Sequence, residues 1–273
     1  MKIISVLITS FNRKSKTIKC LEKLFSQNEG DFNLKVFLVD DGSSDGTSEA
    51  IREKYPQVII LQGDGNLYWN RGMYKAWAEA SKEGADCYLW LNDDTFLYED
   101  AINNMLKALD IVEKESIIIG TTCSISNKEL TTYGCRDDKK VIQNDGVMRE
   151  CKTFNGNCVL VPSSVYSKLG NLDYKFRHSF GDIEYGMRAD KYGIKAFNVS
   201  NHIGTCELHD SLKSCFSPKV SINNRFKHFY SPLGMNPFEF FYLNNKYKGF
   251  FAALKVFITT HVRVLFPHLW LSN

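Results

Sequence analysis

Residues 34–54 read LKVFLVDDGSSDGTSEAIREK and carry three structural signals in succession. The run 34–40 is apolar at nearly every position, which is typical of a strand that is buried on both faces. Gly, Ser and Asp then mark a turn, and a helix is predicted over 47–54. A strand followed by a turn and a helix is the unit from which parallel sheets with crossover helices are built.

The same alternation continues on both sides of this unit. We predict further strands at 3–9, 58–61 and 87–92 and helices at 15–26, 70–81 and 99–114. The sequence therefore predicts an α/β fold with an open, doubly wound, mostly parallel sheet that is flanked by helices. In such a sheet the ligand lies at the carboxyl ends of the strands.

The pattern loosens beyond Ile119, before a clear helix at 182–191. We expect an irregular second half that closes the ligand cleft. The predicted organisation is a catalytic domain at 1–217, divided into a nucleotide-binding half at 1–120 and an acceptor-binding half at 121–217, and a helical extension at 218–273.

The composition is that of a globular protein. With 273 residues, 44% of them hydrophobic and 24% charged, the chain can form a core and is neither disordered nor collagen-like. A net charge of +3 is too small to predict a nucleic-acid partner. The eight cysteines show neither CxxC pairs nor zinc-ligand spacing, so we predict reduced thiols in a cytoplasmic protein. The apolar run 3–8 is shorter than a signal-peptide core.

Two pairs of adjacent acids lie where predicted strands end. Asp40 and Asp41 end the strand 34–40, where carboxylates accept hydrogen bonds from a nucleoside, unless the turn only caps the next helix. Asp93 and Asp94 follow the run 87–92. Because buried acids without a counter-charge are costly, we expect a divalent cation here, Mg²⁺ or Mn²⁺, which also binds diphosphate oxygens.

Two further motifs lie in the second half of the chain. Asn155 and Gly156 form a dipeptide that is typical of a turn, and an apolar strand follows it. Asp182 begins the helix 182–191, and Glu184 lies two residues later. Asp182 is interpreted either as a proton-accepting carboxylate or as an N-cap in a helix whose dipole favours acids in its first turn.

Six motifs together resemble the family 2 glycosyltransferases of the GT-A fold, and most closely bacterial members that build surface polysaccharides. They occur in the family's order over most of residues 1–200: TSFNR (9–13), DDGSSDGT (40–47), GNLYWNRGM (65–73), NDDT (92–95), FNGNCVLVP (154–162) and GDIEYGMR (181–188). The resemblance implies a metal-dependent, inverting hexosyltransferase that uses a nucleoside diphosphate sugar.

The resemblance also implies roles for individual residues. The first two motifs hold the base and ribose of the nucleotide in this family, and the third and fifth approach the sugar and diphosphate. The residues implied to contact the donor are Thr9, Phe11, Asp40, Asp41, Asn66, Arg71, Asp93, Asn155 and Gly156.

Asp94 matches the metal-binding last acid of the family's DxD element. Asn92 stands where that element has its first acid, so the metal keeps one firm protein ligand. The third ligand is left open between His202, His209 and none. The implied cofactor is Mn²⁺ or Mg²⁺.

Asp182 matches the acid that the family uses as general base. Such a carboxylate takes the proton of the acceptor hydroxyl while that oxygen attacks the anomeric carbon. Glu184 is the second candidate for this role. The family more often has a Glu-Asp pair at this position, and Gly181 replaces the Glu.

The last part of the chain differs in composition from the rest. Residues 218–273 contain 13 aromatic residues and seven Lys or Arg against one acid, Glu239. A basic amphipathic helix is predicted from Lys248 onward, and no membrane span is predicted. Residues 246–270 are expected either to bind an anionic membrane surface or to pack on their own domain or on a second subunit of a homo-oligomer.

We therefore predict a glycosyltransferase that moves a sugar from a nucleoside diphosphate, UDP or dTDP in preference to GDP, to a hydroxyl of a lipid-linked surface glycan. The predicted localisation of the protein is the cytoplasm, at the inner face of the cell membrane. The alternatives are a GT-A protein that binds the nucleotide sugar without turnover, and a nucleotidyltransferase, which would need a Gly-rich loop after the first strand. The sequence leaves open the donor sugar, the base, the linkage, the acceptor and the oligomeric state.

Overall fold

The computed structural model describes residues 1–112, 115–137, 140–208 and 215–270. It packs as two compact units. Residues 1–173 and 182–208 form the first unit, and residues 174–181 with those from 209 onward form the second. This division concerns compactness alone, and the nucleotide-binding and acceptor-binding halves stay a prediction.

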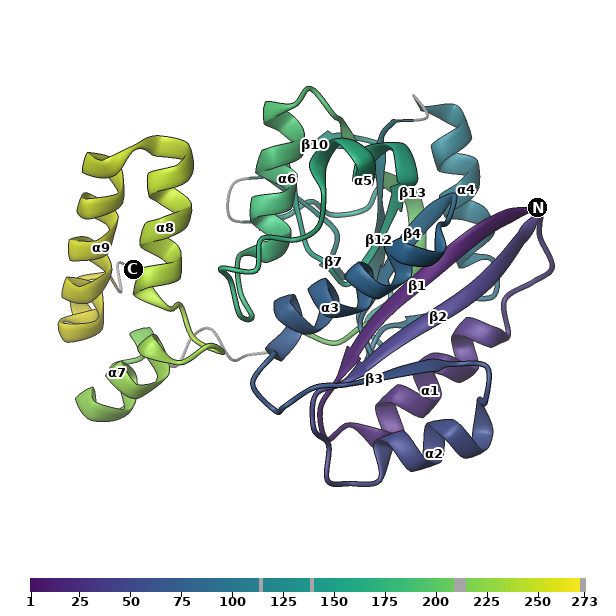
Figure 1. Ribbon diagram of the computed structural model, residues 1–273. Helices are drawn as coiled ribbons and strands as arrows, with labels where there is room; N and C mark the ends of the chain where they lie inside the picture. The colour runs from purple at the N-terminus through teal and green to yellow at the C-terminus, as the bar shows by residue number, and fades with distance from the viewer. Residues whose placement is uncertain (113–114, 138–139, 209–214, 271–273) are drawn as a thin grey trace. The chain divides into compact units, whose positions relative to one another are not determined.

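A mixed, mostly parallel sheet is the centre of the first unit (Figure 1). Four strands in its amino-terminal half are parallel neighbours in the order β4-β1-β2-β3. They are β1 (Lys2–Ser10), β2 (Phe32–Asp40), β3 (Ile59–Gln62) and β4 (Cys87–Leu91). Because all four run in one direction, their carboxyl ends meet at one edge of the sheet, as the sequence predicts.

The second half of the first unit extends this sheet with shorter and mixed strands. β12 (Cys158–Pro162) runs antiparallel between β4 and β6 (Ile117–Cys123), and β13 (Ala196–Thr205) runs parallel to β6. The remaining strands are β5 (Phe96–Leu97), β7 (Thr131–Tyr133) and β10 (Glu150–Cys151) in the same sheet, and β8 (Cys135–Asp137), β9 (Lys140–Val141) and β11 (Thr153–Phe154) in a separate small sheet.

Helices cover both faces of the main sheet, which confirms the doubly wound architecture. On one face the side chains of Ile4, Val6 and Ile8 pack against α1 (Lys14–Phe25), α2 (Thr47–Lys54) and α4 (Ala101–Ile111). On the other face Leu7 and Trp90 belong to the cluster formed with α3 (Tyr68–Glu83), α5 (Ser163–Leu169) and α6 (Gly181–Lys191). The alternation of strand side chains between two covered faces explains why the strands are apolar at nearly every position.

The second unit is helical. Its elements are α7 (Ile222–Tyr230), α8 (Pro237–Lys248), α9 (Phe250–Leu265) and a 3₁₀ turn, η2 (Pro267–Trp270). Asn236 caps α8, because its side-chain oxygen accepts hydrogen bonds from the backbone N–H groups of Phe238 and Glu239 at 3.1 and 3.2 Å. Within the described residues, no helix combines the length and the apolar character that crossing a membrane requires.

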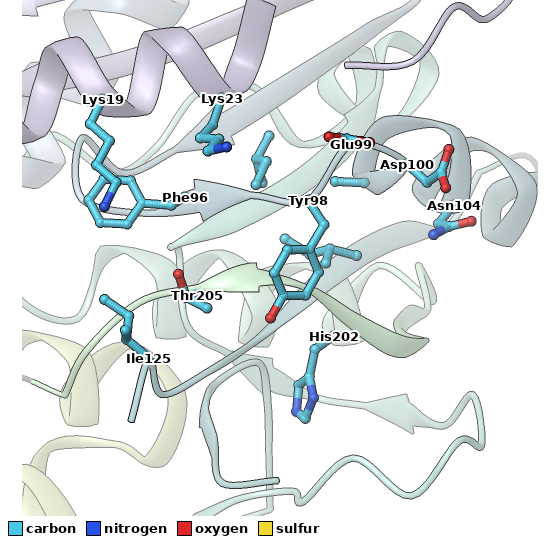
Figure 2. Close-up of a pocket in the computed structure, with 13 residues that line it drawn as sticks. Lys19, Lys23, Phe96, Tyr98, Glu99, Asp100, Asn104, Ile125, His202 and Thr205 are labelled. Atoms are coloured by element: carbon cyan, nitrogen blue, oxygen red, sulfur yellow. The ribbon is translucent and has the colours of Figure 1, made fainter. Parts of the chain in front are cut away.

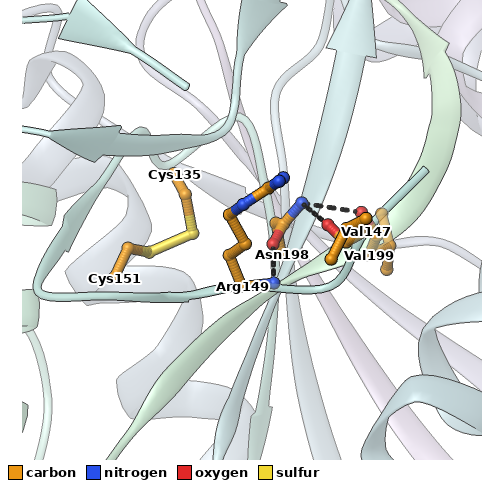
Figure 3. The surroundings of a disulfide bond; sticks show 6 residues. All are labelled: Cys135, Val147, Arg149, Cys151, Asn198 and Val199. Atoms are coloured by element: carbon orange, nitrogen blue, oxygen red, sulfur yellow. Dashed lines mark hydrogen bonds between the residues drawn. A yellow bond between two sulfur atoms is a disulfide. The ribbon is translucent and has the colours of Figure 1, made fainter. Parts of the chain in front are cut away.

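The prediction that all cysteines are reduced is wrong for one pair. Cys135 on β8 and Cys151 on β10 form a disulfide, with their Cα atoms 5.8 Å apart (Figure 3). The six other cysteines are free and buried. The pair has no short sequence spacing that marks it, since only the return of the chain between β8 and β10 brings the two residues together.

An asparagine on β13 holds the backbone next to this disulfide. The side-chain oxygen of Asn198 accepts a hydrogen bond from the Arg149 N–H at 2.5 Å (Figure 3). Its amide nitrogen donates to the carbonyls of Val147 at 3.3 Å and Val199 at 3.0 Å. The disulfide and this amide therefore fix the edge of the sheet, although the sequence pattern there is weak.

Candidate active site

Two loops at the carboxyl edge of the sheet form one rigid rim. The Asn12 N–H, after β1, donates to the Ser43 hydroxyl at 2.8 Å, and the Ser44 N–H, after β2, donates to the Asn12 side-chain oxygen at 2.8 Å. The backbone N–H of Lys14 donates to Asp45 at 2.9 Å. Asn12 has a left-handed φ of 51°, which Asn tolerates better than most residues.

The first acid pair stabilises these loops from inside. Asp40 and Asp41 are buried at 2% and 3% exposure. Asp40 accepts hydrogen bonds from the Ser43 N–H, at 2.9 Å, and from the Ser48 hydroxyl. It thus joins the end of β2 to the start of α2.

Asp41 holds the loop that leads into α3. Its two carboxylate oxygens accept three backbone N–H bonds, from Gly65, Leu67 and Tyr68, each at 2.9 Å. Tyr68 has a left-handed φ of 56°, a strained conformation for a residue with a side chain. Because a carboxylate offers about four lone-pair positions, a nucleotide base at Asp41 would find most of them already in use.

Other predicted donor contacts lie around this rim. Phe11 is 50% exposed, and Asn66 is exposed in the turn before α3. Thr9 lies near the end of β1 beneath α3, so closely that a Cβ atom at Gly72 would be 2.2 Å from its hydroxyl oxygen. Arg71 is half-buried in the first turn of α3. The structure brings these residues to one edge of the sheet, and their contacts with a donor stay a prediction.

The second acid pair is neutralised by an arginine. Asp93 and Asp94 follow β4 and are 4% and 6% exposed. One guanidinium nitrogen of Arg13, Nη1, lies 3.0 Å from an oxygen of Asp93 and 2.8 Å from an oxygen of Asp94. Burial raises the pKa of Asp93 to about 6, although the attraction of Arg13 opposes the shift.

Arg13 is a site residue that the sequence reasoning missed. It belongs to the TSFNR motif but received no role there. The two buried acids are paired with this arginine, whereas the sequence analysis considered only a metal ion as their cationic partner. The signal that identifies Arg13 is a cationic side chain in the loop after β1, because β1 and β4 are adjacent parallel strands whose ends meet.

The acid pair offers hard oxygen ligands of the kind that Mg²⁺ and Mn²⁺ prefer. Among the residues that the structure describes, no three His, Cys, Asp or Glu side chains converge on a common metal position. The Cys206 thiol donates to Asp94 at 3.7 Å, and burial raises the pKa of Cys206 to about 12. An ion bound by Asp93 and Asp94 would therefore share them with Arg13 and complete its shell with water or phosphate oxygens.

Neither histidine candidate joins the acid pair in the described structure. His202, on β13, forms a hydrogen bond with the Thr131 hydroxyl at 2.9 Å. It lines a cavity of about 560 Å³ together with Lys19, Lys23, Phe96 and Tyr98 (Figure 2). The described lining of that cavity includes neither Asp94 nor Asp182. His209 lies outside the described residues.

A series of contacts connects the acid pair to Asp182. The indole N–H of Trp69 donates to the side-chain oxygen of Asn92, next to the acid pair, at 2.7 Å. The Trp69 ring lies against Gly156, where a Cβ atom would be 2.5 Å from it. The Gly156 N–H in turn donates to Asp182 at 2.9 Å. The motifs around 69, 92, 156 and 182 are therefore parts of one site.

Asp182 and Glu184 have different surroundings. Asp182 accepts N–H bonds from Gly156 and, at 2.8 Å, from Ile183, and burial raises its pKa above the usual value for Asp. Glu184 is fully buried and pairs with Arg188 at 2.9 Å. Arg188 also donates to the carbonyls of Leu169 and Asn171. Glu184 is thus held within the packing of α6, whereas Asp182 lies beside the turn at 155–156.

One polar atom in that turn lacks an internal partner. The backbone N–H of Asn155 donates to the Gly134 carbonyl at 3.0 Å. Its buried side-chain oxygen has no hydrogen-bond partner within the described part of the chain. Because buried acceptors are normally satisfied, this atom is a natural contact for a ligand hydroxyl.

A family model for "Glycosyl transferase family 2" matches residues 5–192, which is most of the first unit. The chain belongs to glycosyltransferase family 2. It is therefore a glycosyltransferase, and its mixed sheet with helices on both faces is the GT-A fold.

Relatives within family 2 are distant in sequence. A dolichyl N-acetyl-α-D-glucosaminyl phosphate 3-β-D-2,3-diacetamido-2,3-dideoxy-β-D-glucuronosyltransferase from Methanococcus voltae is 22% identical over 81% of this chain and 72% of its own length. The hyaluronan synthase of Streptococcus pyogenes is 25% identical over 60% of this chain and only 40% of the synthase. The alignment thus spans about two fifths of that larger enzyme.

Solved structures share the fold at low sequence identity. TarS residues 1–349 from S. aureus, in complex with UDP-GlcNAc, align with a TM-score of 0.60 and 15% identity over the whole of this chain and 74% of that one. The mannosyltransferase PcManGT from Pyrobaculum calidifontis, in complex with GDP-Man and Mn²⁺, aligns with a TM-score of 0.57 and 13% identity over 99% of this chain and 76% of that one. These likenesses confirm the predicted fold.

Proposed function

We propose that this family 2 glycosyltransferase is an inverting, metal-dependent enzyme that transfers a sugar from a nucleoside diphosphate to a hydroxyl of a lipid-linked surface glycan. The observation that supports it is the series of contacts from Asp182 through Gly156 and Trp69 to Asn92 and the acid pair. This series links a carboxylate suited to proton transfer with a charged group suited to a diphosphate.

The donor in this proposal is a nucleotide sugar whose nucleotide is UDP or dTDP. The GT-A neighbours bind UDP-GlcNAc in one case and GDP-Man in another, so the fold accepts more than one base. The exposed ring of Phe11 would contact the base. The unsatisfied oxygen of Asn155 would accept a hydrogen bond from a hydroxyl of the donor sugar.

Asp182 is the proposed general base. It accepts the proton of the acceptor hydroxyl, the acceptor oxygen forms a bond to the anomeric carbon, and the bond from that carbon to the diphosphate breaks with inversion. Burial raises the pKa of Asp182, which increases its basicity. The N–H bonds from Gly156 and Ile183 stabilise the carboxylate and orient it.

The acid pair is the proposed place of the cofactor. Asp94, with Asp93 beside it, would hold Mg²⁺ or Mn²⁺, and such an ion neutralises charge on a departing diphosphate. Arg13 orients both carboxylates and neutralises them. Its positive charge also adds to the attraction for a diphosphate.

The acceptor is proposed to be a glycan on a lipid carrier. The Methanococcus voltae relative is named for a transfer to a dolichyl-linked sugar phosphate, and hyaluronan synthase is named for a polysaccharide. An enzyme with such an acceptor would work at the inner face of the cell membrane.

A screen of nucleotide sugars for release of nucleoside diphosphate tests this proposal. We expect release with at least one donor, dependence on Mn²⁺ or Mg²⁺, and near-complete loss in Asp182→Asn. Glu184→Gln is not informative as a control, since Glu184 is buried in an ion pair. Asp190→Asn is the matched control, because Asp190 is an exposed acid near the other end of α6.

The alternatives give other outcomes in the same screen. Binding of a nucleotide sugar without release of diphosphate, with every donor and a lipid-linked acceptor mixture, would indicate a binding protein. Release of inorganic pyrophosphate from a nucleoside triphosphate would indicate a nucleotidyltransferase. Either result contradicts the proposal.

A further inference from the structure

Helix α9 of the second unit has one face that packs and one that does not. Ala253, Thr260 and Val264 are buried. The face opposite to them carries Phe251, Leu254, Ile258 and Leu265, whose spacing of three, four and seven residues places them on one side of a helix. Their exposed fractions are 85% for Phe251, 54% for Ile258 and 38% each for Leu254 and Leu265.

The apolar surface continues beyond the end of α9. Phe266 is 56% exposed and Leu269, in η2, is 71% exposed. Exposed apolar side chains that occur singly are ordinary, but six of them within residues 251–269 are not, and such groups mark sites of interaction. We call Phe251, Leu254, Ile258, Leu265, Phe266 and Leu269 the apolar row.

Basic residues border the apolar row. Lys255 is exposed on α9 and lies beside the row, and Lys248 is exposed at the end of α8. Arg263 lies on the other side of α9, where its guanidinium is 4.4 Å from the centroid of the Phe216 ring. The single acid among residues 218–270, Glu239, is buried and accepts a hydrogen bond from Arg177 at 2.8 Å. No acidic side chain in the described part of this region is therefore exposed beside the row.

An apolar row with basic residues along its edge is complementary to an anionic bilayer. The apolar side chains would enter the boundary between headgroups and acyl chains, and Lys248 and Lys255 would contact lipid phosphates. A second copy of this chain offers the same positive charge, so pairing two rows would bring like charges together. The charge distribution thus favours a lipid surface over self-association.

We infer that α9 and η2 form a membrane-binding surface that lies flat on an anionic bilayer, with Phe251 and Ile258 inserted. This surface binds the protein peripherally, and its occupant is phospholipid with anionic headgroups. It is independent of the donor chemistry, because no residue of the candidate active site belongs to it.

Flotation of the full chain with vesicles measures this binding directly. We expect retention on vesicles of phosphatidylglycerol and phosphatidylcholine at low salt, weaker retention at high salt, and little on phosphatidylcholine alone. Phe251→Glu should lower the partition coefficient about ten-fold or more, since an aromatic side chain that would insert into the bilayer is replaced by a charge. Lys248→Gln and Lys255→Gln should each lower it about five-fold.

A matched control separates insertion from added charge. Ile111, at the end of α4 in the first unit, is 77% exposed, so Ile111→Glu makes the same kind of change away from the row. Its retention should equal that of the unmodified chain. Both Glu variants should keep the same circular dichroism spectrum and donor hydrolysis in solution, because neither residue is packed or part of the active site.

Three results would overturn the inference. One is failure of the unmodified chain to float with anionic vesicles at low salt. Another is equal retention of Phe251→Glu and the unmodified chain. The third is a dimer in sedimentation experiments that Phe251→Glu dissociates and that does not bind vesicles, since the row would then be covered by a second copy.

Discussion

The chain has two Asp-Asp pairs at the ends of parallel strands, and the fold treats them in opposite ways. Asp40 and Asp41, after β2, are satisfied by backbone N–H groups and a hydroxyl. Asp93 and Asp94, after β4, are held by the guanidinium of Arg13. The first pair accepts hydrogen bonds from neutral donors and forms part of the loops. The second pair is bound by the full positive charge of Arg13, with which a cationic ligand can compete. The same dipeptide is thus bound by neutral groups in one place and by a charged side chain in the other.

The largest expected effect concerns the second pair. Asp94→Ala should lower kcat/KM for transfer about 10²- to 10³-fold, because the variant loses the proposed ligand of the metal ion that would neutralise the departing diphosphate. The free energy of unfolding should change by less than about 1 kcal/mol, since Asp93 remains to pair with Arg13. Transfer kinetics and urea denaturation measure the two quantities. Loss of folding together with activity would contradict the comparison.

The first pair should show its effect in stability. Asp41→Asn replaces a carboxylate that accepts three N–H bonds with an amide that has one acceptor oxygen, and we expect a loss of about 3 kcal/mol in the free energy of unfolding. Urea denaturation of the purified variant provides the measurement. A variant that remains as stable as the unmodified chain, yet binds no nucleotide, would show that Asp41 acts mainly on the ligand.

The raised pKa of Asp93 predicts a dependence on pH in chelator-treated protein. Because the pKa is about 6 in the folded chain and near 4 in the unfolded chain, the folded state binds more protons between these values. Stability should therefore fall as the pH rises through this window, by about 3 kcal/mol in total, and Asp93→Asn should remove the fall. Denaturation at several pH values checks this. If the stability of Asp93→Asn depends on pH in the same way, another group is responsible for that dependence.

The smallest expected effect concerns the link from the second pair to Asp182. Gly156→Ala places a methyl group against the Trp69 ring and should displace the turn that orients Asp182. We expect a fall of about ten-fold in kcat with little change in KM for the donor, since the reacting groups are misplaced rather than removed. Ser163→Ala, at the start of α5, serves as a control outside the site. A change confined to KM would place Gly156 in donor binding alone.

Much of the fold was predictable from the sequence because its determinants are local. The helix at 47–54 is found as predicted, and β2 and β4 differ from their predictions only at their ends. The helix predicted at 99–114 ends earlier, at Ile111, and residues 113–114 lie outside the described structure. The short strands between 131 and 154 were not assigned, since runs of two or three residues leave no periodic pattern.

The candidate site was predictable in its motifs and not in its contacts. The resemblance identified Asp94, Gly156 and Asp182, and the structure brings their motifs together. The pairing of Arg13 with the acids and the N–H bonds of Asp41 join residues that are far apart in the sequence. Such contacts depend on how strands are ordered in the sheet, which no single segment specifies.

The position of Trp69 makes the site visible to spectroscopy. Trp77 and Trp90 are fully enclosed, whereas Trp69 is half-buried and donates its indole hydrogen to Asn92 beside the acid pair. A donor or metal ion that arrives there alters the polarity around this ring while the two enclosed indoles keep their surroundings. Native fluorescence of the unlabelled protein can therefore follow the binding of a donor or metal ion in real time, and Trp69→Phe serves as the control without this signal.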